Sequence, residues 1–141
     1  WLSWPVLFLI LRGSKRTRAV IVVGSDVLLL KGRLGSNKWA LPGGGIKSGE
    51  QPELSVLREI KEEVGLDISK SSLIYLGQQY YSEDGIGFDI LLYGIRLTEK
   101  PSIKIQKKEI SKYCWLPVDQ INASNSNGDT RIALRTWNNT Q

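Results

Sequence analysis

Runs of β-branched and aromatic residues, bounded by glycine, serine, aspartate and proline, predict strands on both sides of a central amphipathic segment. The first two runs, 17–23 and 27–31, flank the turn residues Gly24-Ser25-Asp26 and predict a hairpin of buried strands. Residues 101–106 fit either a short strand or a loop. Later runs of the same character predict further strands at 38–41, 73–81, 88–97 and 112–116.

The longest helical pattern covers residues 51–64. Ser48 followed by Gln51 resembles a capping box, and Pro52 suits the first turn of a helix. Gly65 is a natural C-terminal stop. At about 100° per residue the segment has an apolar side, which we expect to face the core. That side comprises Leu54, Leu57, Ile60 and Val64.

A second helix is predicted at 129–137, with Ile132, Leu134 and Trp137 available for packing. It follows a helical turn at 118–121 and the polar linker 122–128, while 32–37 and 82–87 are expected to be loops. Strands before the central helix, strands after it and a closing helix predict an α/β fold with a mixed sheet between helices.

The central helix also carries three carboxylates, Glu59, Glu62 and Glu63; Glu59 is three residues from Glu62 and four from Glu63, so the three are neighbours on the helix surface. Like charges in such a group repel, and a divalent cation removes that penalty. Mg²⁺ prefers hard oxygen ligands and usually binds one or two protein carboxylates together with substrate phosphates. A solvated acidic face is the alternative interpretation of the same residues.

The segment around these carboxylates resembles a known family. Gly44, five residues, Glu50, seven residues and then REIKEEVGL at 58–66 are similar to a complete Nudix box, and the lead-in WALPG at 39–43 is similar to the usual one. A match at this many fixed positions is far more specific than a lone glycine-rich motif. The resemblance implies the α/β/α sandwich of the Nudix family for a domain at 17–141, preceded by an apolar and basic extension at 1–16.

The resemblance also implies Mg²⁺-dependent hydrolysis of a pyrophosphate bond in a nucleoside diphosphate linked to another group, with Mn²⁺ as an alternative ion. By the same resemblance, the metal ligands would be Glu59, Glu62, Glu63 and the backbone carbonyl of Gly43. Glu59 would also orient or deprotonate the attacking water, and Arg58 would pair with a carboxylate of the box. Glu50 is expected to support the loop.

Family members often place a general base on a downstream loop, and Glu109 is the first candidate here, with Glu83 and Asp84 as the second. A solvated residue among lysines is the alternative interpretation of Glu109. Substrate contacts are expected from Gly44, Gly45, Tyr80 and Tyr81, with Phe88 and Trp39 as further aromatic candidates. Because Arg58 and the box carboxylates are all present, a hydrolase is favoured over a Nudix-fold nucleotide-binding or regulatory module without turnover.

Composition narrows the chemistry. The chain has 141 residues, a net charge of +5 and no histidine, which excludes His-dependent mechanisms and zinc sites that need imidazole. Basic residues gather at 12–18 and 100–112, but no recognisable nucleic-acid-binding motif accompanies them. A phosphate-rich small substrate would be steered by the same field. We therefore expect a nucleotide-type small molecule as partner, and not nucleic acid.

The single cysteine, Cys114, excludes an internal disulfide framework and favours a cytoplasmic location. Residues 1–11, from Trp1 to Leu11, are strongly apolar but too short to span a bilayer, which needs about 20 residues. They are expected to pack on the core, and an interfacial membrane anchor followed by basic residues is the alternative. The pattern leaves the oligomeric state open, with a homodimer as one expectation.

Overall fold

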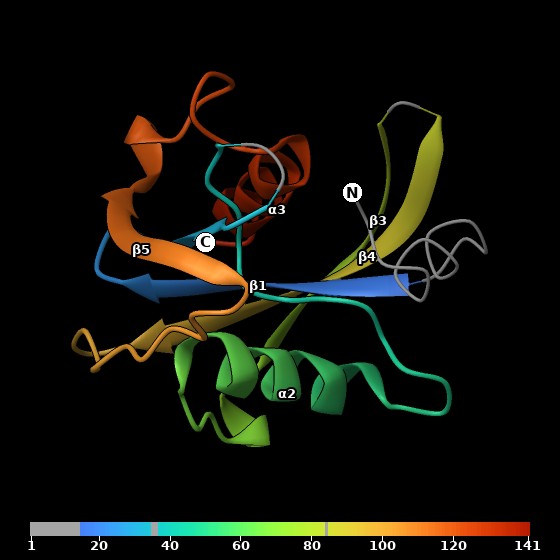
Figure 1. The fold of residues 1–141 in the computed structure, drawn as a ribbon, viewed down its shortest axis with the longest axis horizontal. Helices are drawn as coiled ribbons and strands as arrows, with labels where there is room; N and C mark the ends of the chain where they lie inside the picture. Colours follow the sequence, from blue (N-terminus) through green and yellow to red (C-terminus); the bar gives the residue numbers. More distant parts are fainter. Residues whose placement is uncertain (1–14, 35–36, 84) are drawn as a thin grey trace.

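A five-stranded mixed sheet lies between two helices, with α2 on one face and α3 on the other (Figure 1). The computed structural model describes residues 15–34, 37–83 and 85–141. The strand order across the sheet is β3-β4-β1-β2-β5, and β1 pairs in parallel with β4 while the other neighbours are antiparallel. The elements in chain order are β1 (Lys15–Val23), β2 (Asp26–Gly32), α2 (Pro52–Val64), η1 (Lys70–Ser72), β3 (Ile74–Glu83), β4 (Ile86–Leu97), β5 (Ile110–Pro117), η2 (Val118–Gln120) and α3 (Gly128–Asn139).

This architecture confirms the predicted mixed sheet between helices, and both predicted helices are present at nearly the predicted bounds. Residues 101–106 form a loop, which settles the choice that the sequence left open. Residues 38–41 form only isolated bridges at Trp39 and Ala40, so a full strand there was wrong. The loop expected at 82–87 is shorter, because β3 continues to Glu83 and β4 begins at Ile86.

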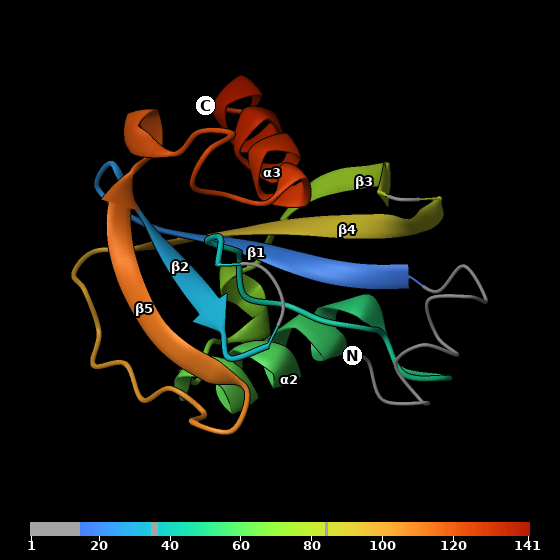
Figure 2. The ribbon, with the colours of Figure 1, turned by 45° about the horizontal axis from the view of Figure 1, so that its top comes forward.

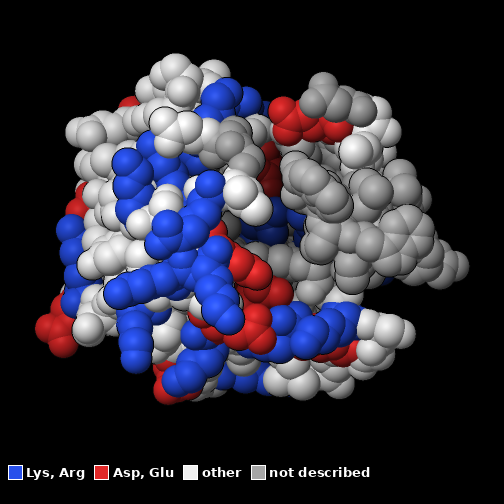
Figure 3. All heavy atoms as spheres, viewed as in Figure 1, with Lys and Arg blue, Asp and Glu red and all other residues white. Residues whose placement is uncertain are grey.

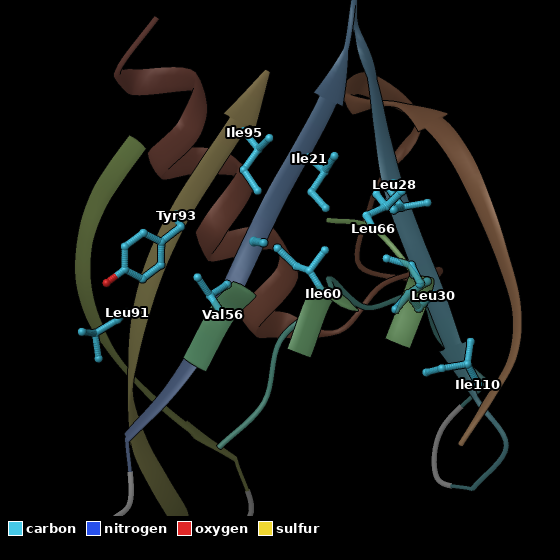
Figure 4. Close-up of a cluster of buried hydrophobic side chains, with 12 residues drawn as sticks. Ile21, Leu28, Leu30, Val56, Ile60, Leu66, Leu91, Tyr93, Ile95 and Ile110 are labelled. Carbon is cyan, nitrogen blue, oxygen red and sulfur yellow. The ribbon is translucent and has the colours of Figure 1, made fainter. Parts of the chain in front are cut away.

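The core has two layers, because both faces of the sheet are covered. On the α2 face, side chains of the helix meet those of β1, β2 and β4, and Figure 4 shows Val56 and Ile60 pointing toward this group. On the α3 face, Trp137 and Leu134 pack against the alternate residues of the same strands. Alternation along each strand sends successive side chains into opposite layers, which is why these strands are nearly continuous in apolar residues.

The buried side of α2 differs from the predicted one. Ile60 and Val64 are buried as expected, but Leu54 is 50% exposed, and Val56 is fully buried in its place. The apolar stripe is therefore centred near Ile60 and rotated away from Leu54. The expected capping box is also absent, because the N-cap residue is Gln51 and no side chain caps the helix. Gly65 ends the helix in the left-handed conformation, as predicted.

The hairpin of β1 and β2 opens immediately after its turn. Only two residue pairs join the strands, Val22 with Val27 and Val23 with Asp26, and Figure 2 shows the strands diverging from there. The segment that leads into the Nudix-like box fills the gap. It bridges to β2 at Ala40 and to β1 at Gly45, so the glycine turn lies in the middle of the sheet.

No helix among the described residues is long and apolar enough to cross a membrane. Residues 1–11 lie outside the described part of the chain, so both interpretations of that segment stay predictions.

Candidate active site

The glycine turn at 43–45 is held tightly against β1. The carbonyls of Pro42 and Gly44 accept hydrogen bonds from the amides of Ala19 and Thr17, at 2.9 and 2.8 Å. Gly43 lies between them with a φ of 144°, and a Cβ atom there would lie 2.0 Å from the carbonyl oxygen of Thr17. Only glycine fits this position. Among the described residues, no donor is paired with the carbonyl of Gly43.

Two carboxylates of α2 lie against this turn. The carboxylate of Glu63 accepts a hydrogen bond of 2.8 Å from the amide of Gly43. A Cβ atom on Gly44 would lie 2.5 Å from Glu59 Oε1, so the missing side chain leaves room for that carboxylate. The turn and the helix thus form one unit in which two glycines face two acidic side chains.

Burial governs the ionisation of both carboxyl groups. The pKa of Glu63 is raised to about 8, chiefly because burial penalises the charged form, and Glu59 and Glu109 add repulsion. Burial likewise raises the pKa of Glu59, although the adjacent Arg58 guanidinium opposes this shift. In the metal-free protein, therefore, this group of carboxylates holds a proton that a cation would displace.

Arg58 fixes the surrounding carboxylates, as the resemblance implied. Its Nε and Nη2 atoms donate to the two oxygens of Glu50 at 2.8 and 3.1 Å, and Nη1 donates to Glu59 at 3.0 Å and to Glu62 at 3.3 Å. Hydrogen bonding to Arg58 is the main reason that the pKa of Glu50 is lowered to about 2. Glu50 also accepts from the amide of Lys47, so it closes the box loop onto the helix.

Glu109 lies near this group, although 46 residues separate it from Glu63 in the sequence. The loop before β5 runs along the end of α2, where the amides of Lys104 and Gln106 donate to the carbonyls of Val64 and Glu63 at 3.0 Å each. This brings the Glu109 carboxylate close enough to raise the pKa values of Glu59 and Glu63 by repulsion.

These residues fit a magnesium ion. The donor set consists of hard carboxylate oxygens and the Gly43 carbonyl, which has no donor among the described residues, and burial raises the pKa values of Glu59 and Glu63, a penalty on their charged forms that a cation would offset. Within the described part of the chain, no three acidic side chains are already grouped as a set of metal ligands. Mg²⁺ suits such an open arrangement, because it keeps several waters and takes few protein ligands.

A cavity of about 330 Å³ opens between β1, β3, β4 and the start of α3. Arg18 forms part of its wall, and its Nε atom donates to Asp129 at 2.9 Å. The Arg18 guanidinium also acts on Glu63, lowering the pKa of that carboxyl against the effect of burial. Arg18 thus faces the cavity on one side and the carboxylates on the other. The lining residues are Arg18, Tyr81, Glu83, Ile86, Phe88, Asn127 and Asp129.

The two predicted tyrosines separate onto opposite faces of β3. Tyr81 lines the cavity and packs edge-on against Phe88, with ring centroids 5.8 Å apart. Tyr80 is 67% exposed and lies against Gly87, so the structure does not bring it to the cavity. Glu83 lines the cavity and accepts from the Tyr81 hydroxyl at 3.0 Å. Asp84, the other second-choice base, lies outside the described residues.

The sequence did not single out Arg18 and Asp129, which together form the most buried ion pair near the site, with side chains 13% and 8% exposed. One signal was present, because Arg18 is the basic residue directly before the apolar run Ala19 to Val23 of the same strand. An arginine directed inward from a buried strand needs a partner, and a carboxylate in the first turn of a distant helix can supply one.

Comparisons with known proteins show the family and the fold of this chain. The model of the NUDIX domain family matches residues 13–136. An RNA pyrophosphohydrolase of Hydrogenovibrio crunogenus is 33% identical over 99 residues, which cover 70% of this chain and 56% of that protein. An RNA pyrophosphohydrolase of Marinomonas sp. is 53% identical over 47 residues, which cover 33% of this chain and 29% of that protein. The chain thus spans about half the length of the first of these curated relatives and less than a third of the second.

Among solved structures, a MutT NUDIX hydrolase from Burkholderia pseudomallei superposes with a TM-score of 0.76 at 23% identity, covering 87% of this chain and 96% of that one. At this level of identity the likeness concerns the fold. It confirms the α/β/α sandwich that the box pattern implied.

Proposed function

Because the chain belongs to the Nudix family, we propose that it is a divalent-metal-dependent pyrophosphohydrolase acting on a nucleoside diphosphate linked to another group. One observation carries the proposal. Glu59 and Glu63 converge on the glycine turn within electrostatic reach of Glu109, in a site where burial penalises charged carboxyl groups and a bound cation would offset that penalty. A solvated acidic face would not be buried in this way.

Glu59, Glu62, Glu63 and the Gly43 carbonyl would hold the metal, with Mg²⁺ preferred and Mn²⁺ as an alternative. When bound, the ion would neutralise phosphate charge and lower the pKa of a coordinated water. Glu62 is half exposed, and among the described residues its carboxylate is hydrogen-bonded to Arg58 alone, so it can turn toward an ion. Arg58 would keep Glu59 in place through its stronger contacts with Glu50 and Glu59.

Glu59 and Glu109 are the candidates for orienting or deprotonating the attacking water. Glu59 is half-buried and already bonded to Arg58, which favours a positioning or ligand role. Glu109 is exposed and makes no side-chain hydrogen bond or ion pair with the described residues, so its carboxylate can accept a proton from a water on the outer side of the site. We therefore assign the general base to Glu109.

The cavity on the α3 face would take the nucleoside. Tyr81 and Phe88 offer aromatic surface for a base, and Arg18 lies between the cavity and the carboxylates, where a phosphate of the same ligand would sit. Gly44 and Gly45 let the backbone approach the phosphates. Tyr80 has no role in this proposal, because it is exposed on the other face of β3.

The test is release of phosphate or pyrophosphate from nucleoside triphosphates, nucleotide sugars, ADP-ribose, dinucleoside polyphosphates and an RNA oligonucleotide with a 5′-triphosphate. The RNA is included because relatives bear the name RNA pyrophosphohydrolase, although the sequence alone did not favour a nucleic acid partner. Metal-dependent release that is lost in Glu63→Gln and falls at least tenfold in Glu109→Gln is the expected result. Glu99→Gln, on an exposed loop, is the matched control.

A folded protein that binds Mn²⁺ and the ligands without releasing phosphate would instead favour a nucleotide-binding module. The presence of Arg58 with all its carboxylate partners supports turnover over this alternative.

A further inference from the structure

A basic surface lies on the opposite side of the carboxylates from the nucleoside cavity. Figure 3 shows basic side chains gathered over β5, next to acidic side chains near the middle of this face. The sheet order explains this arrangement. The cavity lies on β1, β3 and β4, and the basic residues come from β2, β5 and the loops beside them. The glycine turn lies between these two regions, in the gap where β1 and β2 diverge. We define this surface by Lys31, Arg33, Lys38, Lys107, Lys108 and Lys112.

The cations of this surface are crowded. Lys31 lies directly across the ladder from Lys112, a like-charge pair that destabilises a sheet. None of the surface cations forms an ion pair with a carboxylate of the described residues. Elsewhere the protein does pair its exposed lysines, as in Lys61 with Asp67 and Lys100 with Asp26.

The surface is also ordered by its own contacts. The Lys31 ammonium lies over the Trp39 ring, 4.4 Å from its centroid. Arg33 Nε donates to the carbonyl of Lys107, and the amide of Arg33 donates to the carbonyl of Glu109 at 2.9 Å. The loop that carries Glu109 is thereby tied to the end of β2. The basic surface begins at the residue next to Glu109 and reaches Lys112 roughly 10 Å farther along β5.

We propose that this basic surface binds the distal part of the substrate, and that this distal part is an oligophosphate chain. The inference rests on the proposed function, because it takes the nucleoside to lie in the cavity and the cleaved bond at the carboxylates. A substrate that joins both sides would place its nucleoside near Arg18 and Phe88 and its outer phosphates over Lys31 and Lys112. A neutral sugar in the distal position would leave these cations unpaired, so substrates with a longer phosphate chain are favoured over nucleotide sugars.

Three substrates carry an oligophosphate chain and differ in the group to which it is attached. They are a nucleoside tetraphosphate, a dinucleoside tetraphosphate and a 5′-triphosphorylated oligoribonucleotide. A nucleotide sugar with a neutral distal group serves as the reference. The test variant is Lys31→Gln combined with Lys112→Gln, since both side chains are at the surface. Lys70→Gln combined with Arg135→Gln removes two exposed charges from other parts of the surface and is the matched control.

We expect the test variant to raise KM for the oligophosphate substrates roughly 3- to 10-fold while leaving kcat and the nucleotide sugar unchanged. The control should change neither. A second readout does not need turnover: binding of inorganic tripolyphosphate without divalent metal should weaken by a similar factor in the test variant only.

The outcomes separate the two proposals. Equal loss for the sugar and the oligophosphates, or unchanged tripolyphosphate binding in the test variant, would overturn the role of the basic surface while leaving hydrolysis intact. Absence of turnover with every substrate would refute the proposed function, and tripolyphosphate binding would still decide whether the surface recognises phosphate chains.

Discussion

The backbone amide of Gly43 and the carboxylate of Glu63 are joined by a hydrogen bond of 2.8 Å across 20 residues of sequence. The opposite side of Gly43 presses on the carbonyl of Thr17, so the same residue contacts β1 and the helix. The glycine turn therefore couples the sheet to the position of the most buried carboxylate in the site.

Replacement of Gly43 by alanine should disturb both contacts. The new Cβ would overlap the Thr17 backbone, so we expect the free energy of unfolding to fall by about 2–4 kcal/mol, measured by urea denaturation. Gly24→Ala is the control, because Gly24 also has a positive φ but nothing lies within 4 Å of its Cβ position. It should cost only about 1 kcal/mol. Equal costs for the two variants would contradict the packing argument.

Metal binding should release a proton from Glu63. The pKa of this carboxyl is about 8 in the metal-free protein, so it is largely protonated at pH 7 and must ionise to bind a cation. Calorimetric titration with Mg²⁺ at pH 7, in buffers of different ionisation enthalpy, should show release of up to about one proton per ion. Affinity should rise with pH up to about 8. Glu63→Gln should abolish this proton release.

The same shift predicts how the stability of the metal-free protein depends on pH. Because the folded-state pKa of Glu63 exceeds its ordinary value of 4.5, the unfolded chain binds fewer protons between pH 4.5 and about 8. The contribution of Glu63 to stability should therefore decrease as pH rises through this window. Urea denaturation in the presence of EDTA measures this contribution when the original chain is compared with Glu63→Gln. If the free energy of unfolding had the same pH slope in both proteins, the raised pKa would not belong to Glu63.

Glu50 should make the free energy of unfolding decrease as pH falls, which is the opposite of the pH dependence expected from Glu63. Its pKa is lowered to about 2, so its bond to Arg58 stabilises the fold above pH 4.5 and is lost as pH falls from 4.5 toward 2. Arg58→Lys removes the two-pronged contact, and we expect the acid-dependent loss to shrink by about 1–2 kcal/mol. Lys61→Arg, on the exposed side of the helix, is the control. An unchanged acid slope in Arg58→Lys would count against this pairing.

The Arg18 and Asp129 pair should behave as a buried ion pair. Asp129→Asn leaves the Arg18 charge without its partner, so we expect a loss of about 2–4 kcal/mol in stability and a higher KM for nucleotides. The double variant Arg18→Met with Asp129→Leu should lose about 1 kcal/mol less stability than the sum of the losses in its two single variants. Additive losses in urea denaturation would show that the two side chains act independently.

Local chemistry made much of the fold predictable. Pro52 and Gly65 bound the central helix because the first favours an initial turn and the second adopts the left-handed conformation that ends it. The strands followed from β-branched runs, and the glycine turn with its carboxylates followed from the spacing of the box. Each of these features depends on residues that are close in sequence.

Which side of a helix becomes buried depends on where the sheet lies. The sequence placed Leu54 in the core, but α2 is rotated so that Val56 is buried in its place. Glu63 lies seven residues after Val56, about 20° away on the helical wheel, so the rotation that buries Val56 also draws Glu63 into the site. The carboxyl with the most perturbed pKa was therefore identified by its spacing but not by its burial.

The chain by itself determined the helix, the strands and the set of box carboxylates, because helix caps, strand propensity and the spacing of charges act over a few residues. Only the tertiary structure decided that β1 and β2 open around the glycine turn, that Glu109 joins Glu59 and Glu63, and that Arg18 meets Asp129 across 111 residues. These arrangements depend on the order of strands and on the path of the connecting loops. Both are fixed by long-range burial, which no local pattern of residues records.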